Sequence, residues 1–281
     1  SLSVKKNGTQ RCKQAYRCSG CGYCWLQSGN RKVSWERYYR QWLFDRRLLE
    51  EIAQSASVSV KTVQRRFDAL EIDDTPLPPA SKGAVPLVID GTFFGDWGLF
   101  CYHDTKRVIH IEEMKTEGSV TLMRGMRQLR EAGSHFSSVT LDGKTGFPKA
   151  IRKMFPHLPI QMCHFHMQQI IVRHLRSAPK HPAKKDLQEL MQTLGDDPQA
   201  FIDRFHVLMD RHGMLLKEKT SDGKYRNKKL RSAYQSLKKH LSRLFIYTEI
   251  SGANIPNTTN HLDGLFSHVK KYLALHQGLN E

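Results

Sequence analysis

The spacing of apolar and polar residues divides the chain into four parts. Residues 1–30 are rich in Gly, Lys and Cys and show almost no periodic apolar pattern, as expected for a small metal-stapled module. Residues 31–72 place apolar side chains at helical spacing. Residues 73–85 contain three prolines and no periodicity, so they predict a stiff linker. From residue 86 onward, short apolar and β-branched runs predict strands.

The largest part, residues 86–281, alternates between strand and helix patterns. Three strand-like runs precede its first helix, which predicts an antiparallel meander, and a crossover helix then leads into parallel pairing. Residues from about 180 to 250 show helical patterns and no convincing strand, so they predict an all-helical insertion. The expected fold class is α/β, with a mixed sheet. Strands are expected at residues 87–90, 98–103, 107–111, 137–142 and 160–163, and helices at 119–132, 148–155 and 164–175.

Residues 48–70 have the layout of a helix-turn-helix. Leu49 and Ile52 would face inward from the first helix, and a serine-rich turn would cap the second helix at Ser57 or Ser59. The second helix then presents polar side chains that suit phosphates and base edges in a major groove. An ordinary solvated helical hairpin is the alternative. The candidate DNA contacts are Lys61, Thr62, Gln64, Arg65 and Arg66.

Charge narrows the set of partners. The chain has 44 Lys and Arg residues against 27 Asp and Glu residues, a formal net charge of +17, so it is expected to bind a polyanion. Ribosomal and membrane-surface proteins are also basic, but they usually lack a long core of strands and helices, which favours nucleic acid. No apolar run approaches the roughly 18 residues of a membrane span, so no membrane segment is expected.

One basic run is strongly one-sided. Residues 217–243 carry ten Lys or Arg residues and two acidic residues. A run of charge is usually a solvated face, but one this unbalanced on a basic protein favours a surface that contacts phosphates. Its candidate contacts are Lys228, Lys229 and Arg231.

Three aspartates could carry chemistry. Asp90 and Asp142 each end an apolar strand and are followed by glycine. A carboxylate at a buried strand end is costly unless it is paired or bound to a cation, so the two suggest a shared metal site; a pair of Asp-Gly turns is the alternative. Asp263 follows Thr258 and Thr259, either of which would cap the last helix. Three carboxylates can hold two divalent cations about 4 Å apart for phosphoryl transfer.

These residues resemble the pattern of the Mutator-like DDE transposases, in particular those of bacterial insertion sequences. The resemblance covers roughly residues 86–278 and is weaker before them. The family has one Asp on the first core strand, another on the fourth, a Cys-x-x-His soon afterwards, a helical insertion, and a Thr-Asn-x-x-Glu-Gly motif that opens the last helix. Asp263 stands where the family most often has Glu. The matching residues are Asp90, Asp142, Cys163 with His166, and Thr259-Asn260-His261-Leu262-Asp263-Gly264.

The resemblance implies a ribonuclease H-like fold and a DNA transposase activity. Asp90, Asp142 and Asp263 would hold two Mg²⁺ or Mn²⁺ ions during DNA cleavage and strand transfer. The Cys-x-x-His pair alone would suggest half of a zinc site, which is the alternative role, but no second pair with ligand spacing follows it. The residues implied to support the active site are Cys163, His166 and Asn260.

The same resemblance implies partners and a location. The partners would be double-stranded DNA, as element ends and target, and further copies of the chain in a homo-oligomer on that DNA. The location would be the bacterial cytoplasm, in association with the nucleoid. Two alternatives stay open: a ribonuclease H-like nuclease, and a non-catalytic DNA-binding regulator derived from a transposase, which the shorter Asp263 makes conceivable.

The cysteines indicate a metal site instead of a disulfide framework, and with it a reducing, cytosolic compartment. Four of the six lie within thirteen residues near the N-terminus, in a stretch that looks like the second half of the zinc ribbon found before many insertion-sequence transposases. Its first Cys-x-x-Cys would fall before Ser1. Either the numbered chain is truncated, or Cys12 and Cys24 join Cys18 and Cys21 in a nonstandard Zn²⁺ site; free cysteines are the alternative.

Overall fold

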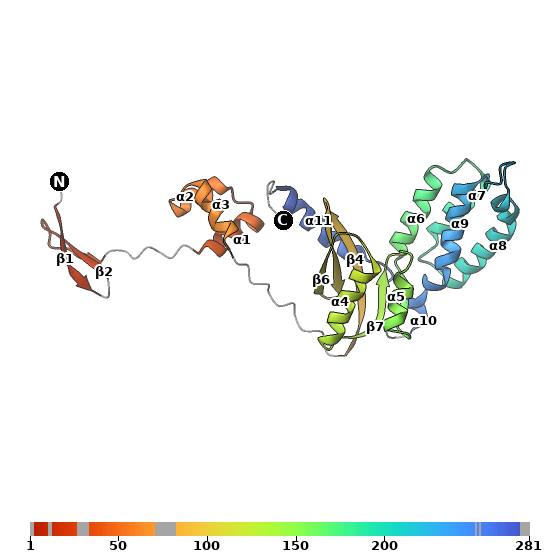
Figure 1. The fold of residues 1–281 in the computed structure, drawn as a ribbon, viewed down its shortest axis with the longest axis horizontal. Coiled ribbons are helices and arrows are strands. Elements are labelled where there is room, and N and C mark those ends of the chain that lie inside the picture. The colour runs from red at the N-terminus through yellow and green to blue at the C-terminus, as the bar shows by residue number, and fades with distance from the viewer. Residues whose placement is uncertain are drawn as a thin grey trace. The chain divides into compact units, whose positions relative to one another are not determined.

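The computed structural model of the protein places the chain in two compact units, shown with its helices and strands in Figure 1. One unit comprises Ser1–Asp74 and Tyr272–Glu281, and the other Thr75–Lys271. The predicted linker at 73–85 lies mostly outside the described residues. Among the helices that the structure describes, none is long and apolar enough to cross a membrane. The described residues are 3–10, 13–26, 34–70, 83–250, 252 and 254–275.

The first described elements form a small antiparallel sheet, in the order β1-β2-β3. The apolar pattern did not predict these strands. The reason is that every residue of β1 is exposed, so no buried face imposes an alternation of apolar and polar residues. The strands are β1 (Val4–Gln10), β2 (Lys13–Cys18) and β3 (Cys24–Leu26).

Three short helices follow and pack around one small core. The Oγ atom of Ser59 accepts a hydrogen bond of 3.2 Å from the backbone N–H of Thr62 and caps the third helix. Ser57, the other predicted cap, instead ends the second helix in a left-handed conformation. The helices are α1 (Trp35–Asp45), α2 (Leu49–Ala56) and α3 (Val60–Asp68). Their buried residues are Ile52, Ala53, Val63 and Phe67.

The larger unit is built on a five-stranded sheet with the order β6-β5-β4-β7-β8. β5 pairs antiparallel with β4 and β6, and β7 pairs parallel with β4 and β8. The predicted mixed sheet, a meander followed by parallel pairing, is therefore confirmed. The strands are β4 (Ala84–Phe94), β5 (Trp97–His103), β6 (Val108–Met114), β7 (His135–Leu141) and β8 (Ile160–Met162).

Alternate residues of β4 face two different cores. Leu87 and Ile89 pack in a core with α4 and α5, whereas Val88 packs in a second core with α11. Since side chains alternate between the two faces of a strand, α4 and α11 lie on opposite faces of the sheet (Figure 1). The helices are α4 (Ser119–Glu131), α5 (Phe147–Met154) and α11 (Asn260–Leu275).

Between β8 and α11 the regular elements among the described residues are helices, and one isolated β-bridge joins Lys219 and Tyr225. α6 and α9 lie side by side (Figure 1) and share a core of large apolar side chains with α7 and α8. The buried Tyr234 hydroxyl donates a 2.8 Å hydrogen bond to the Ala183 carbonyl and links α9 to α7. The elements are α6 (His164–Arg176), α7 (Pro182–Gln192), α8 (Pro198–Lys217), α9 (Lys228–His240), the 3₁₀ turn η1 (Leu241–Arg243) and α10 (Ile246–Glu249).

A close approach fixes how α4 packs on the sheet. A Cβ atom added at Gly125 would come within 2.5 Å of the buried Tyr102 side chain, so Gly125→Ala is expected to lower the free energy of unfolding by roughly 1–3 kcal/mol through overpacking. Gly213, in α8, has nothing within 4 Å of the same atom. There, Gly213→Ala is expected to raise stability by up to about 1 kcal/mol. Urea titrations followed by circular dichroism measure both effects, and equal shifts would contradict the tight contact.

Candidate active site

Asp90 and Asp142 occupy neighbouring places on two parallel strands. The last paired residues of β4 and β7 are Val88 and Thr140, and each aspartate follows two residues later along its strand direction. Residues two apart share a face, and adjacent strands lie about 4.8 Å apart. The register therefore directs both carboxylates to the α11 side of the sheet.

The two aspartates differ in how their strands end. Asp142 directly follows β7, as predicted. The prediction that Asp90 ends its strand is wrong: β4 continues to Phe94, because β5 pairs with it as far as Trp97. What ends just before Asp90 is the parallel pairing with β7.

Asp90 is a buried carboxylate held by two hydrogen bonds. Only 8% of the surface of this residue is exposed. The Thr259 hydroxyl donates to Oδ2 at 2.8 Å, and the Gly91 backbone N–H donates to Oδ1 at 2.8 Å. Burial raises the pKa of Asp90 to about 6, although nearby His166 and the hydrogen bonds from Thr259 and Gly91 partly oppose the rise. The site thus holds a carboxylate that costs free energy to ionise.

The third aspartate approaches from the other end of the sequence. α11 begins at Asn260, so Asp263 lies in its first turn, as predicted. The charge of Asp263 contributes to the raised pKa of Asp90, so the two carboxylates repel one another. Among the described residues, its Oδ2 atom is buried without a hydrogen-bond partner. Thr259, expected as a possible cap for this helix, directs its hydroxyl to Asp90 instead.

Cys163 and His166 surround the same threonine. The backbone N–H of Thr259 donates to Cys163 Sγ at 3.3 Å, and His166 Nδ1 lies 3.5 Å from the Thr259 hydroxyl oxygen. Burial lowers the pKa of His166, but hydrogen bonding with Cys163 and the charges of Asp90 and Asp142 outweigh it and raise that pKa to about 9. His166 is therefore a cation at neutral pH, within electrostatic reach of both strand aspartates.

Glu117 and Lys144 flank Asp142. Burial and the charge of Glu117 raise the pKa of Asp142, while the Lys144 backbone N–H, 3.2 Å from Oδ1, lowers it. The Lys144 amine pairs with Glu117 Oε2 at 2.8 Å. Asp142 thus ionises beside the ion pair of Glu117 and Lys144. The sequence pattern did not identify Glu117 as a residue of this site.

The residues present fit a hard divalent cation. Asp90, Asp142 and Asp263 supply carboxylate oxygens, the ligands that Mg²⁺ prefers, and the orphaned Oδ2 of Asp263 has an unmet need for a cation or donor. Within the described ranges, no three His, Cys, Asp or Glu side chains already stand as a ligand cluster. Binding would therefore require these side chains to turn.

The N-terminal cysteines lie in and beside a tight turn between β2 and β3. The Gly22 N–H donates to the Cys18 carbonyl at 3.0 Å, and hydrogen bonds from the Cys21 N–H, the Gly20 N–H and the Cys21 thiol lower the pKa of Cys18. This turn favours a thiolate, the form that binds zinc. Cys24 Sγ lies 3.5 Å from the Gly22 carbonyl oxygen. Cys12, the fourth predicted ligand, lies outside the described residues.

The polar face predicted for the second helix of the helix-turn-helix belongs to α3. Thr62 is half-buried, with its hydroxyl 3.0 Å from Ser59 Oγ, and the Arg66 guanidinium lies 6.0 Å from the centre of the Trp35 ring. Apart from Thr62, the predicted DNA contacts of α3 have exposed side chains. The exposed residues of this set are Lys61, Gln64, Arg65 and Arg66.

The three candidates on the helical insertion differ. Lys228 and Lys229 are exposed. Arg231 is half-buried: its guanidinium stacks 4.0 Å from the centre of the Tyr225 ring and donates to the Leu216 carbonyl at 3.3 Å. Arg231 therefore fastens the segment before α9 to the end of α8, a structural role that the charge run did not predict. Asn260, the remaining supporting candidate, is exposed at the start of α11.

Most of the larger unit also matches a known family. The model of a transposase family, DDE_Tnp_ISL3, matches residues 87–271, which is more than half of the chain and includes all three aspartates. A search of curated proteins found no match. The narrower resemblance to Mutator-like transposases stays a prediction. By the family match, together with the mixed α/β fold, the chain belongs to the DDE_Tnp_ISL3 family of transposases.

Proposed function

We propose that the protein binds the terminal repeats of a mobile element and catalyses DNA cleavage and strand transfer with Mg²⁺ or Mn²⁺ held by Asp90, Asp142 and Asp263. The observation that supports this proposal is the register of β4 and β7, whose last pair, Val88 and Thr140, stands two residues before Asp90 and Asp142. The third lies on a helix that packs against the same face. All three fall within the residues that match the transposase family.

The chain's own residues prepare this site for phosphoryl transfer. When bound by the carboxylates, a divalent cation activates a water or a 3′-hydroxyl and stabilises the leaving oxygen of an in-line displacement. Thr259 fixes the orientation of Asp90. His166 offsets the negative charge of Asp90 and Asp142 before DNA and cation arrive. Burial of Asp90 keeps water from screening the charges that develop.

DNA recognition is assigned to the smaller unit. The exposed side chains of α3 suit a major groove, and the turn at Cys18 and Cys21 suits half of a Zn²⁺ site. The +17 net charge supports attraction to DNA. Joining two element ends requires more than one catalytic site, so we infer a homo-oligomer on DNA. The resemblance to the Mutator-like transposases of bacterial insertion sequences supports a location in the bacterial cytoplasm, at the nucleoid.

Nicking of a DNA duplex carrying the element's ends tests the proposed chemistry. Cleavage is expected in Mg²⁺ or Mn²⁺ and not in a chelator. Asp90→Asn and Asp142→Asn should each reduce the rate by at least about 100-fold, because each removes an anionic cation ligand. Asp210→Asn is the matched control, since Asp210 is an exposed residue of α8, and it should cleave like the wild type.

Two outcomes would change the assignment. If the wild type does not cut and Asp263→Glu does, the chain is a DNA-binding regulator derived from a transposase. If it cuts but never joins a 3′-ended strand to target DNA, it is a nuclease with the same fold. Cutting that persists in both Asp90→Asn and Asp142→Asn would remove these aspartates from the chemistry altogether.

The raised pKa of Asp90 predicts a cost in stability. At pH 8 the folded protein must hold a buried carboxylate, whereas below about pH 3, well under the ordinary Asp pKa of 3.8, Asp90 is neutral in both the folded and the unfolded state. Without divalent ions, Asp90→Asn is therefore expected to raise the free energy of unfolding by up to about 3 kcal/mol at pH 8, and by nothing at the lowest pH. Urea titrations across this range measure the difference.

A divalent ion should reverse the order of stability of the wild type and the Asp90→Asn variant. Mn²⁺ is expected to raise the unfolding temperature of the wild type and to leave Asp90→Asn almost unchanged, because binding to the folded state alone stabilises it. Asp210→Asn should follow the wild type at every pH. An Asp90→Asn protein that is less stable than the wild type at pH 8 would contradict the buried-charge argument.

Arg65 tests the proposed DNA contact of α3. Arg65→Ala should weaken binding of duplex element ends and reduce the slope of log affinity against log salt by about 0.9, the effect of one lost phosphate contact. Arg40→Ala is the control, because Arg40 is an equally exposed arginine of α1 that pairs with Glu36 at 3.2 Å. Fluorescence anisotropy across a salt series gives both slopes. Equal slopes for the two variants would rule out a specific contact at Arg65.

A further inference from the structure

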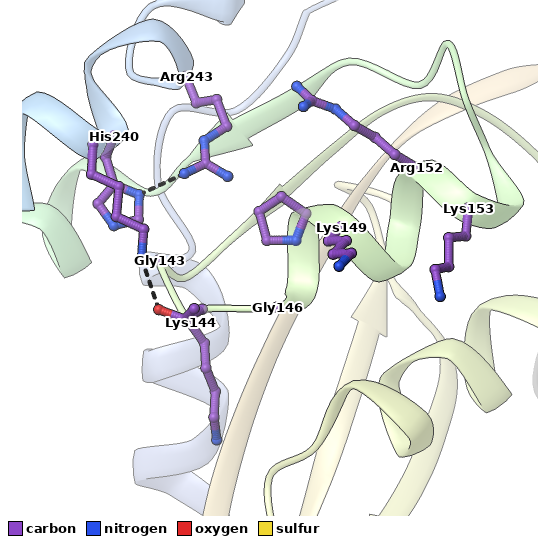
Figure 2. A pocket seen from close by; sticks show the side chains of 11 residues that line it. Gly143, Lys144, Gly146, Lys149, Arg152, Lys153, His240 and Arg243 are labelled. Carbon is purple, nitrogen blue, oxygen red and sulfur yellow. Dashed lines mark hydrogen bonds between the residues drawn. The ribbon is translucent and has the colours of Figure 1, made fainter.

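A basic cavity of about 480 Å³ lies beside the proposed active site, between the turn after β7 with α5 and the end of α9 with η1. Figure 2 shows its side chains around the turn at Gly143 and Gly146, with the Lys144 side chain directed away from His240 and Arg243. None of the residues that line it, all within the described part of the chain, is acidic. The cations that line it are Lys144, Lys149, Arg152, Lys153, Lys239 and Arg243.

Most of this positive charge is not neutralised from within the protein. Lys144 pairs with Glu117, and Lys239 donates to the Thr145 hydroxyl oxygen at 2.8 Å. Arg152 and Lys153 are exposed, and neither has a carboxylate partner among the residues described. The cavity therefore presents cationic groups whose field no carboxylate of the lining cancels.

Burial, together with the same excess of positive charge, lowers the pKa values of His240 and Arg243. Burial, Arg243 and Lys239 lower the pKa of His240 to about 4. His240 is therefore neutral, and its Nδ1 accepts a 3.0 Å hydrogen bond from Arg243. Burial and the charge of Arg152 lower the pKa of Arg243. Such mutual repulsion is costly unless an anion occupies the cavity.

The cavity is fixed in place next to Asp142. Its lining begins at Gly143, where an added Cβ atom would come within 2.6 Å of Met162 and 3.0 Å of His240. The end of α9 thus packs directly on the turn that follows the catalytic strand. The buried Gln161 side chain of β8 adds two ties, donating to the Leu244 carbonyl at 2.7 Å and accepting from the Tyr247 N–H at 3.1 Å.

We propose that this cavity binds backbone phosphates of one DNA strand, the strand whose neighbouring phosphodiester lies at Asp142. The proposal deepens the proposed function and rests on it for the identity of that strand. Its cationic groups only donate hydrogen bonds, which suits phosphate oxygens in any sequence. Its volume lies in the ~300–1,000 Å³ range of binding pockets, which suits a strand backbone and not a whole duplex.

The position of the cavity explains how contacts with phosphates would help the proposed reaction. A strand held at two or more phosphates cannot slide, so the scissile bond stays at the aspartates while water or a 3′-hydroxyl attacks. Because the cations come from both α5 and α9, a strand in the cavity also joins the sheet to the helical insertion. The insertion then acts in positioning the reacting strand through Lys239 and Arg243, at the end of the basic run 217–243 and beyond Lys228 and Lys229.

The test compares two pairs of neutralised cations in the full chain. The first variant, Arg152→Gln with Lys153→Gln, removes two exposed cations of the cavity. The matched control, Lys106→Gln with Arg127→Gln, removes two exposed cations elsewhere in the same unit. Both lower the net charge equally. A short fluorescent single-stranded oligonucleotide is the probe, and its anisotropy is measured from about 50 to 200 mM salt.

The expected result is specific to the cavity. The first variant should bind roughly tenfold or more weakly near 0.1 M salt and show a salt slope reduced by about 1.4, the effect of two lost contacts with a single strand. The control should stay close to the wild type. Equal slopes in the two variants overturn the proposal. Tighter binding of inorganic tripolyphosphate than of the strand, lost in the first variant, also overturns it by assigning the cavity to a free polyphosphate.

Nicking in Mg²⁺ separates this proposal from the proposed function. A reduced slope in a chain that never cuts DNA would support the phosphate cavity and refute the transposase chemistry. An unchanged slope in a chain that cuts normally would refute the cavity and leave the chemistry standing. Circular dichroism of both variants confirms that the exposed substitutions leave the fold intact.

Discussion

The main constraint on the larger unit is that one carboxylate, that of Asp90, lies buried at the centre of its sheet. Asp90 keeps its place because Thr259, 169 residues away in sequence, donates a hydrogen bond to it. That contact joins the first core strand to the start of the last helix. It also brings the third aspartate to the site, since Asp263 lies one helical turn beyond Thr259. A single hydrogen bond thus couples closure of the fold to assembly of the site.

The hydrogen bond from Thr259 does not by itself offset the cost of burying the charge of Asp90. Burial raises the pKa of Asp90 to about 6, and Asp263 adds repulsion while one of its own oxygens has no partner among the described residues. His166 offsets part of this charge, and its own pKa rises for the same reason. The folded chain therefore carries an electrostatic cost at its centre that a divalent cation would relieve. Stability and the proposed chemistry would compete at these residues, as is common where carboxylates gather.

The sequence predicted what depends on local periodicity. Short apolar and β-branched runs predicted the five strands of the larger unit and placed Asp142 next to the end of β7, because the last residues of that strand are continuously buried. It could not predict that Asp90 lies inside its strand, since that depends on how far β5 pairs. β1 escaped notice because it has no buried face. The sequence also did not predict the hydrogen bond from Thr259 to Asp90 or the ion pair of Glu117 with Lys144, because each joins residues far apart in the sequence. The hydrogen bond from Arg231 to the Leu216 carbonyl likewise has no signature in the spacing of residues.

The helical insertion contributes positive charge close to Asp142. A cluster of carboxylates repels DNA, so the nearest phosphates need cations close by but not in contact with the aspartates. Lys144, which pairs with Glu117, lines the basic cavity together with cations from α5, the end of α9 and η1. Gly143 permits this, because a side chain there would displace Met162 and His240 and move α9 away. The turn after β7 therefore places Asp142, the proposed cation ligand, within a few residues of the proposed phosphate-binding cavity.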